Sequence, residues 1–266
     1  MRLVGWYHLP RMSYVDLHTH LLPGIDDGSP TSEETIRHAR HLAEHGVQDV
    51  ACTPHIKREH FPDIDVGELA ALRADTQRAL DEEGIEVRLH PGVELAHTDA
   101  LELDDDDFEL IAQGPAHARW MLLECPFEGL DDDFDDAVAR LTDLGYGVLL
   151  AHPERVLGPI DRLRTHVESG ALLQVNVSSL LGDHGSDTRA VAERLVTKGL
   201  AYCLASDTHP GTREKILPLA DDALRRLGVS ESNAFRLTRS NPRFLLHEGN
   251  PRMALPATEE RVSALS

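Results

Sequence analysis

The strongest constraint on the fold is a regular alternation of short apolar runs with helix-like segments. Seven runs rich in aliphatic and β-branched residues begin roughly 25–40 residues apart, which is the length of a strand–helix–strand unit. This alternation predicts a parallel β-sheet covered by helices, an α/β fold. The predicted strands are Tyr14–Leu17, Val47–Cys52, Ile85–Val93, Trp120–Cys125, Gly147–Ala151, Leu172–Val177 and Ala201–Ala205.

The segments between these runs carry helix signals. Thr31 and Glu34 have the spacing of a capping box, and an apolar stripe follows until Gly46 ends the helix. Similar stripes end at Gly145, Gly199 and Gly228. Three histidines of the first predicted helix, His38, His41 and His45, are expected on its solvated face.

Composition excludes several classes of protein. The 266 residues include 46 acids and 26 Lys or Arg, a net charge of −20, which argues against a protein that binds nucleic acid through a basic surface. Three cysteines cannot form a paired disulfide framework, so we expect a reducing, cytoplasmic compartment. No apolar run approaches the ~18 residues of a membrane span.

Nearly every predicted strand is followed by a histidine or a carboxylate. In β/α barrels and open parallel sheets, the carboxyl ends of the strands form the edge where active sites are built. His18 and His20 alternate along one strand, so both face the same side. The pattern predicts a multinuclear metal site, and histidine with carboxylate but without cysteine suits Mn, Fe or Zn.

At this point the chain resembles a known family. The motifs DLHTHLLPGIDDG, TPH, GVE, LLECPF, AHPER, QVN and SDTH occur in the order seen in the PHP (polymerase and histidinol phosphatase) metallophosphoesterases. They most resemble the manganese-dependent protein-tyrosine phosphatases of bacterial capsule and exopolysaccharide biosynthesis. The resemblance implies a distorted seven-stranded (β/α)7 barrel with the metal site at the C-terminal ends of the strands. The catalytic barrel would span residues 13–246, with an N-terminal extension at 1–12 and a C-terminal tail at 247–266.

The resemblance also implies up to three Mn²⁺ ions held by nine side chains. Asp27 is preferred to Asp26 because the family places its ligand immediately before the glycine. His18, His20, Glu94 and Asp207 would hold one ion; Glu94 would bridge to a second ion held also by Glu124 and His152; Asp27, His55 and His209 would hold the third.

Arg155 and Arg213 match the phosphate-binding arginines of that family, although Arg213 also reads as a surface residue at a helix start. Guanidinium forks bind phosphoryl oxygens in a bidentate manner. The resemblance therefore implies hydrolysis of phosphotyrosine by a metal-activated hydroxide, with a bacterial tyrosine autokinase as the protein substrate and polysaccharide export as the process regulated. Asn176, at the end of the sixth predicted strand, is a candidate for orienting a ligand or the phosphate.

Three alternatives remain at this stage. One is a small-molecule PHP phosphatase, for instance acting on histidinol phosphate, and another is a non-catalytic, metal-stabilised regulatory protein. The third comes from Cys52 and Arg58, which have the C-x5-R spacing of cysteine-dependent phosphatases. Pro54 would remove an N–H from such a phosphate-binding loop, which disfavours it. The oligomeric state and the general acid for the leaving group stay open.

Overall fold

The computed structural model describes residues 12–250, which contain nine strands. Every predicted strand position contains a strand, and three have the predicted bounds. The strands are β1 (Tyr14–Thr19), β2 (Val47–Cys52), β3 (His55–Ile56), β4 (Arg88–His90), β5 (Glu94–Ala96), β6 (Trp120–Glu124), β7 (Gly147–Ala151), β8 (Leu172–Asn176) and β9 (Ala201–Ala205).

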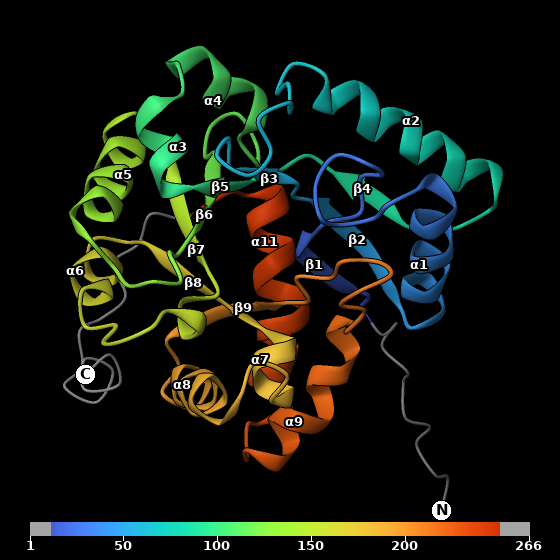
Figure 1. The fold of residues 1–266 in the computed structure, drawn as a ribbon. Coiled ribbons are helices and arrows are strands. Elements are labelled where there is room, and N and C mark those ends of the chain that lie inside the picture. The colour runs from blue at the N-terminus through green and yellow to red at the C-terminus, as the bar shows by residue number, and fades with distance from the viewer. Residues whose placement is uncertain (1–11, 251–266) are drawn as a thin grey trace, which may run out of the picture.

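Helices lie around the outside of the strands, and the prediction of a parallel α/β fold is confirmed (Figure 1). None of the helices in residues 12–250 is long and apolar enough to cross a membrane. The α-helices are α1 (Ser32–Glu44), α2 (Leu69–Glu82), α3 (His97–Glu102), α4 (Asp105–Ile111), α5 (Asp132–Asp143), α6 (Leu163–Glu168), α7 (Val177–Leu181), α8 (Ser186–Thr197), α9 (Ala220–Arg226), α10 (Glu231–Phe235) and α11 (Asn241–His247). Short turns of other helix types are η1 (Pro153–Arg155), η2 (Leu217–Leu219) and η3 (Arg236–Ser240).

The strands do not form the predicted seven-stranded barrel. They form two parallel sheets, with the orders β1-β2-β4 and β3-β5-β6-β7-β8-β9. Two of the predicted strands are followed by an additional short strand that was not predicted. Pro54 breaks the chain between β2 and β3, and Pro91 breaks it between β4 and β5. Proline has no N–H to donate to a strand ladder, so each break moves the chain from the first sheet to the second.

The other seam between the sheets lies where β1 meets β9. A single parallel bridge joins Thr19 to Thr208 there. The backbone N–H of Asp207 donates to the His18 carbonyl, and that of His20 donates to the Thr208 carbonyl, both at 2.9 Å. These bonds place the first polar motif of the chain directly beside the last one.

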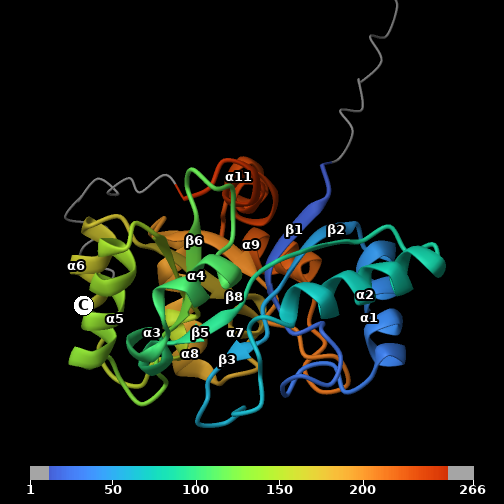
Figure 2. The same ribbon diagram turned by 90° about the horizontal axis from the view of Figure 1, so that it is seen from above.

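The inner faces of the strands enclose a separate apolar cluster. It includes Val15, Leu17, Leu122 and Leu149, and Leu245 of α11 completes it. α11 crosses the end at which the strands begin, and the long loops after β1 and β3 extend from the other end (Figures 1 and 2). The indole N–H of Trp120, at the start of β6, donates to the Leu245 carbonyl at 3.0 Å. The strands therefore have one end closed by a helix and one end free for a site.

The bounds predicted for the domain, 13–246, are not tested by the fold and stay a prediction. Most of the predicted extension and tail, residues 1–11 and 251–266, lies outside the described residues. Within the described part, Asn250 is buried, and its backbone N–H donates to the Ala118 carbonyl at 3.1 Å.

α1 begins as predicted but buries one of its histidines. Thr31 is the N-cap, and its hydroxyl accepts the Glu34 backbone N–H at 3.3 Å. His41 is half-buried and His45 is exposed, but His38 is fully buried, which corrects the prediction for that residue. Its Nε2 lies 3.0 Å from the Thr208 hydroxyl, so the helix docks on the loop that follows β9.

Burial lowers the pKa of His38 from 6.5 to about 4, so the folded protein holds it neutral. The unfolded chain protonates it below pH 6.5, and stability is lost as the pH falls from 6.5 towards 4. We expect His38→Gln to remove about 2 kcal/mol of the stability loss that urea unfolding measures between pH 7 and pH 5. His45→Gln is the control, and an equal pH slope in all three proteins would contradict the assignment.

Candidate active site

The carboxylate of Glu94, the first residue of β5, lies at the centre of a histidine cluster. Its Oε2 is 3.1 Å from His18 Nε2, 3.3 Å from His20 Nε2 and 3.2 Å from His55 Nδ1. Its Oε1 is 2.7 Å from His152 Nε2. Glu94 is 1% exposed, so its charge is balanced by these neighbours and not by water. The cluster draws on residues from both sheets.

The first predicted metal-binding set is brought together completely. The ligand atoms of His18, His20, Glu94 and Asp207 all lie within 4.8 Å of one another, and all four side chains are buried. Asp207 Oδ1 is 3.6 Å from the Nε2 atom of each of the two β1 histidines. The alternation along β1 predicted this shared direction, and the β1–β9 seam supplies the aspartate.

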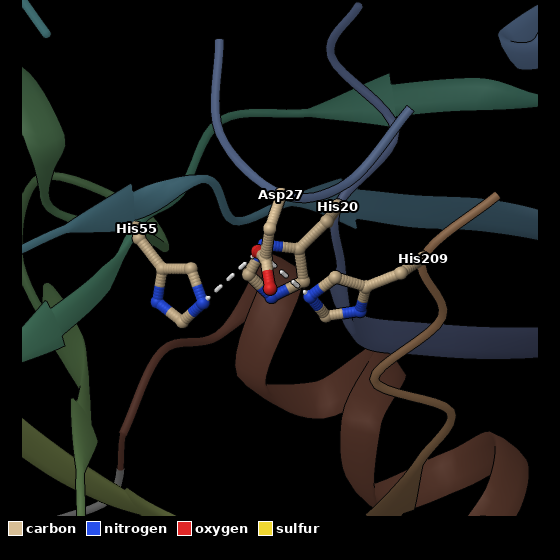
Figure 3. Close-up of side chains that lie close together, drawn as sticks. All are labelled: His20, Asp27, His55 and His209. Carbon is tan, nitrogen blue, oxygen red and sulfur yellow. Dashed lines mark hydrogen bonds and ion pairs between the residues drawn. The ribbon is translucent and has the colours of Figure 1, made fainter. Parts of the chain in front are cut away.

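The third predicted set, Asp27, His55 and His209, also lies together, and His20 joins it (Figure 3). Asp27 Oδ1 is 3.1 Å from His209 Nε2 and 3.4 Å from His55 Nε2. Asp26 points elsewhere: its Oδ2 is 2.8 Å from His20 Nδ1. Asp27 therefore faces the histidines, while Asp26 holds the ring of His20 from behind.

The loop that carries these two aspartates depends on a close backbone approach at Gly28. A Cβ at Gly28 would lie 2.3 Å from the His20 carbonyl oxygen, which backbone atoms cannot accommodate. The Ser29 N–H donates to that same carbonyl at 3.0 Å. Glycine is thus required for the loop to fold back over the end of β1.

The second predicted set is only partly assembled. Glu124 groups with Glu94 and His55, whereas His152 contacts Glu94 but does not join that group. Glu124 instead pairs with Lys57, whose Nζ lies 3.0 Å from Glu124 Oε2. Lys57 was not among the predicted site residues. Its signal in the sequence was its position two residues after His55, directly after the end of β3.

Two site residues have backbones in the left-handed region. His152 has φ of 35° and Asp207 has φ of 53°, and they are the non-glycine residues with positive φ in the described chain. His152 directly follows β7, and Asp207 lies two residues after the end of β9. Such conformations are costly and cluster at functional sites. Here they turn a histidine and an aspartate inward at the point where each strand ends.

Electrostatics of the site favour the charged carboxylates. Burial alone would raise the pKa of Glu94, but the neighbouring His18 and His55 hold it well below its ordinary range. Burial likewise opposes charge on His20, yet its contacts with Asp26 and Glu94 raise the pKa of that imidazole well above its ordinary value. The buried carboxylates therefore stay negatively charged and stabilise positive charge on the groups around them.

The donor set fits divalent cations. His18 Nε2 and His20 Nε2 face each other at 3.3 Å, with the carboxylates of Glu94 and Asp207 beside them. The buried Nδ1 of His152 has no hydrogen-bond partner within residues 12–250. Nitrogen and oxygen donors without sulfur suit Mn, Fe or Zn. The individual metal-ligand roles stay predictions.

The two predicted arginines occupy different depths. Arg155 is half-buried: its Nη1 lies 3.0 Å from Asp207 Oδ2, and its guanidinium lies 4.4 Å from the centre of the Phe127 ring. Arg213 is 40% exposed, and its Nη2 lies 2.6 Å from His209 Nε2. Both line a pocket of about 540 Å³ that opens onto Glu94 and Asp27.

A buried row of amides on β8 supports the centre. The Nδ1–H of His18 donates to Gln174 Oε1 at 3.0 Å, and Gln174 Nε2 donates to Asn176 Oδ1 at 2.7 Å. Asn176 Nδ2 then donates to Asp207 Oδ2 at 2.8 Å. Asn176 thus contacts Asp207, a predicted metal ligand. Gln174, which was not among the predicted site residues, orients His18, another predicted ligand. Their spacing of two residues along a strand was the available signal.

The C-x5-R alternative is not supported by the geometry. Cys52 is fully buried at the end of β2, and burial raises the pKa of its thiol to about 12. Arg58 lies outside the pocket, where its Nε is 3.8 Å from Asp99 Oδ1. A protonated thiol without a phosphate-binding loop is not a nucleophile.

Comparison with solved structures defines the class of fold. One match comes from the crystal structures of YwqE of Bacillus subtilis and CpsB of Streptococcus pneumoniae, which are described as metal-dependent tyrosine phosphatases. The TM-score is 0.79 and the sequence identity is 25%, and the match covers 92% of this chain and 98% of that one. The phosphotriesterase homology protein of Escherichia coli matches with a TM-score of 0.56 at 17% identity, over 88% and 98% of the two chains, which shows a shared fold alone.

The family follows from the sequence comparisons. The family model for capsular polysaccharide synthesis, CpsB/CapC, matches residues 14–247, so this chain belongs to that family. The tyrosine-protein phosphatase YwqE of Bacillus subtilis (strain 168) is 32% identical over 201 residues, 73% of this chain and 77% of the relative. The tyrosine-protein phosphatase CpsB of Streptococcus agalactiae is 23% identical over 209 residues, 73% of this chain and 82% of the relative. The family predicted from the motifs is confirmed.

The amide row predicts a metal-affinity phenotype. Gln174→Leu leaves the buried Nδ1–H of His18 without its acceptor, so the ring loses its fixed orientation. We expect Mn²⁺ to bind roughly 10- to 100-fold more weakly, as measured by titrating metal-free protein under electron paramagnetic resonance. Gln48→Leu, on an exposed position of β2, is the matched control. Equal affinity in both variants and the parent would rule out the supporting role.

Proposed function

We propose that this protein is a metal-dependent protein-tyrosine phosphatase that hydrolyses phosphotyrosine and regulates polysaccharide export. The observation that carries the proposal is the cluster of four histidines around the buried Glu94, which opens into a pocket bearing Arg155. Membership of the CpsB/CapC family and relatives named as tyrosine phosphatases support the same function.

The predicted ligands would hold up to three ions, with Mn²⁺ proposed and Fe or Zn as alternatives. Bound divalent ions lower the pKa of a coordinated water and neutralise phosphoryl oxygens. The chain's own contribution is positional: Glu94, Asp207 and Asp27 supply the negative charge that gathers cations, and Gln174 and Asp26 fix the rings of His18 and His20. The general acid stays unassigned.

Arg155 is proposed to bind the phosphate. In the structure it pairs with Asp207 at 3.0 Å, so the guanidinium already lies beside the predicted ions. A phosphate entering the pocket offers it a second set of acceptor oxygens, and the planar fork matches two of them. Arg213, at the outer edge, is proposed to contact the same phosphate from the solvent side.

The proposed substrate is a phosphotyrosine protein, specifically a bacterial tyrosine autokinase that controls polysaccharide export. Capsular polysaccharide synthesis in the family description supports this assignment. The cytoplasmic location expected from the cysteines stays a prediction. Residues 13–246 are proposed as the catalytic unit.

Metal removal and substrate choice test the proposal together. We expect a chelator to abolish hydrolysis of a phosphotyrosine peptide and Mn²⁺ to restore it, because the described pocket presents no activated thiol. Histidinol phosphate should be hydrolysed at least about 10-fold less efficiently. Cys52→Ser should keep most of the activity and serves as the control. Full turnover after metal removal, verified by elemental analysis, would refute the proposal.

Arg155→Lys separates phosphate binding from structural pairing. Lysine keeps the charge but loses the fork, so we expect unchanged metal content and kcat/KM lower by roughly 10-fold. If Arg155 only neutralises Asp207, the melting temperature falls and the kinetics of the folded protein stay unchanged. Metal stoichiometry, melting temperature and kcat/KM measured on one preparation distinguish the two.

A further inference from the structure

Two phenylalanines line the pocket beside the predicted metal centre, and no role proposed so far uses them. Phe61 lies on the loop between β3 and α2, and Phe127 lies on the loop after β6. Both rings are half-buried. The other residues that line the pocket are mostly charged or polar, so two apolar phenyl rings are unusual in these surroundings.

Each ring packs on a histidine that contacts Glu94. Phe61 stacks on His55 with ring centres 5.4 Å apart and planes 7° from parallel. Phe127 lies against His152 with ring centres 5.5 Å apart. His55 approaches Oε2 of Glu94, whereas His152 approaches Oε1. The two phenyl rings therefore flank the pocket at the two oxygens of one central carboxylate.

The loops that carry the two rings are held by backbone hydrogen bonds. The backbone N–H of Phe61 donates to the Lys57 carbonyl at 2.8 Å, and the Phe127 carbonyl accepts the Leu157 N–H at 2.8 Å. Arg155 lies over the Phe127 ring at 4.4 Å, and Lys57 Nζ lies 5.7 Å from its centre. Cations over an aromatic face further restrict that ring. The walls are thus present before a substrate enters.

We propose that Phe61 and Phe127 form the walls that hold the phenyl ring of a phosphotyrosine, and so set the preference for aryl over alkyl phosphate esters. The inference rests on the proposed function, since it assigns the substrate class of the same site. Aromatic rings bind one another through offset or edge contacts in addition to apolar burial. A phosphoserine offers its phosphate to the same arginines but no ring to these walls.

The physical distinction between the two substrates lies in where binding energy comes from. Phosphate contacts are common to both esters, whereas wall contacts serve the aryl ester alone. Ring contacts of this kind are present in the ground state and in the transition state alike, so their loss raises KM and leaves kcat nearly unchanged.

The test uses one peptide carrying either phosphotyrosine or phosphoserine, with the full-length, metal-loaded protein. For Phe61→Leu and Phe127→Leu we expect kcat/KM on phosphotyrosine to fall about 10-fold each, through KM, because one aromatic face is lost. On phosphoserine we expect a clearly smaller fall than on phosphotyrosine, because that ester has no ring to contact the walls. Phe61→Tyr keeps a ring and should retain the phosphotyrosine preference. Phe244→Leu, a 43% exposed position on α11, is the matched control.

The outcomes separate the two proposals. In one outcome the parent protein prefers phosphotyrosine, but the leucine variants, with full metal content, lose both activities equally or lose neither. The proposed role of the two phenylalanines is then wrong, and the phosphatase function stands. If the parent protein hydrolyses phosphoserine as well as phosphotyrosine or better, the proposed function fails and the inference fails with it.

Discussion

The contact between one buried carboxylate and four imidazoles is the interaction on which the site depends. Glu94 is shielded from water and lies within 3.3 Å of His18, His20, His55 and His152. A buried charge is stable only when oppositely charged or hydrogen-bonding groups surround it. The four histidines lie in or directly after three strands, β1, β3 and β7, so Glu94 also ties the ends of those strands together. Its position at the start of β5 is therefore central to both the fold and the chemistry.

The division of the strands into two sheets makes this convergence geometrically feasible. Pro54 and Pro91 end the ladder of the first sheet, and β3 and β5 continue in the second. At the other seam, two backbone bonds join the loop after β9 to β1. The site lies across both seams, where strand ends are free to turn inward. The left-handed backbones of His152 and Asp207 are part of the same adaptation.

The charge distribution also differs between the chain as a whole and its pocket. The chain has a net charge of −20, which repels phosphorylated substrates at long range. In the pocket, Lys57, Arg155 and Arg213 stand around the carboxylates, and predicted cations would add to them. Attraction for phosphate is thus local and short-ranged. The rings of Phe61 and Phe127 lie beside these cations, and in the proposed role they would add a second, apolar component to recognition.

The sequence by itself determined the α/β class, the family and the strand ends that carry the polar residues, because hydrophobic periodicity and short motifs are local properties. The family resemblance favoured Asp27 over Asp26 as a ligand; in the structure Asp27 lies against His209 and Asp26 against His20. Three features depended on contacts between distant segments: the split into two sheets, the burial of His38 against Thr208, and the pairing of Lys57 with Glu124. The amide row through Gln174 likewise joins β8 to β1 and β9. Tertiary structure decided these because local patterns do not specify which distant side chains share a buried volume.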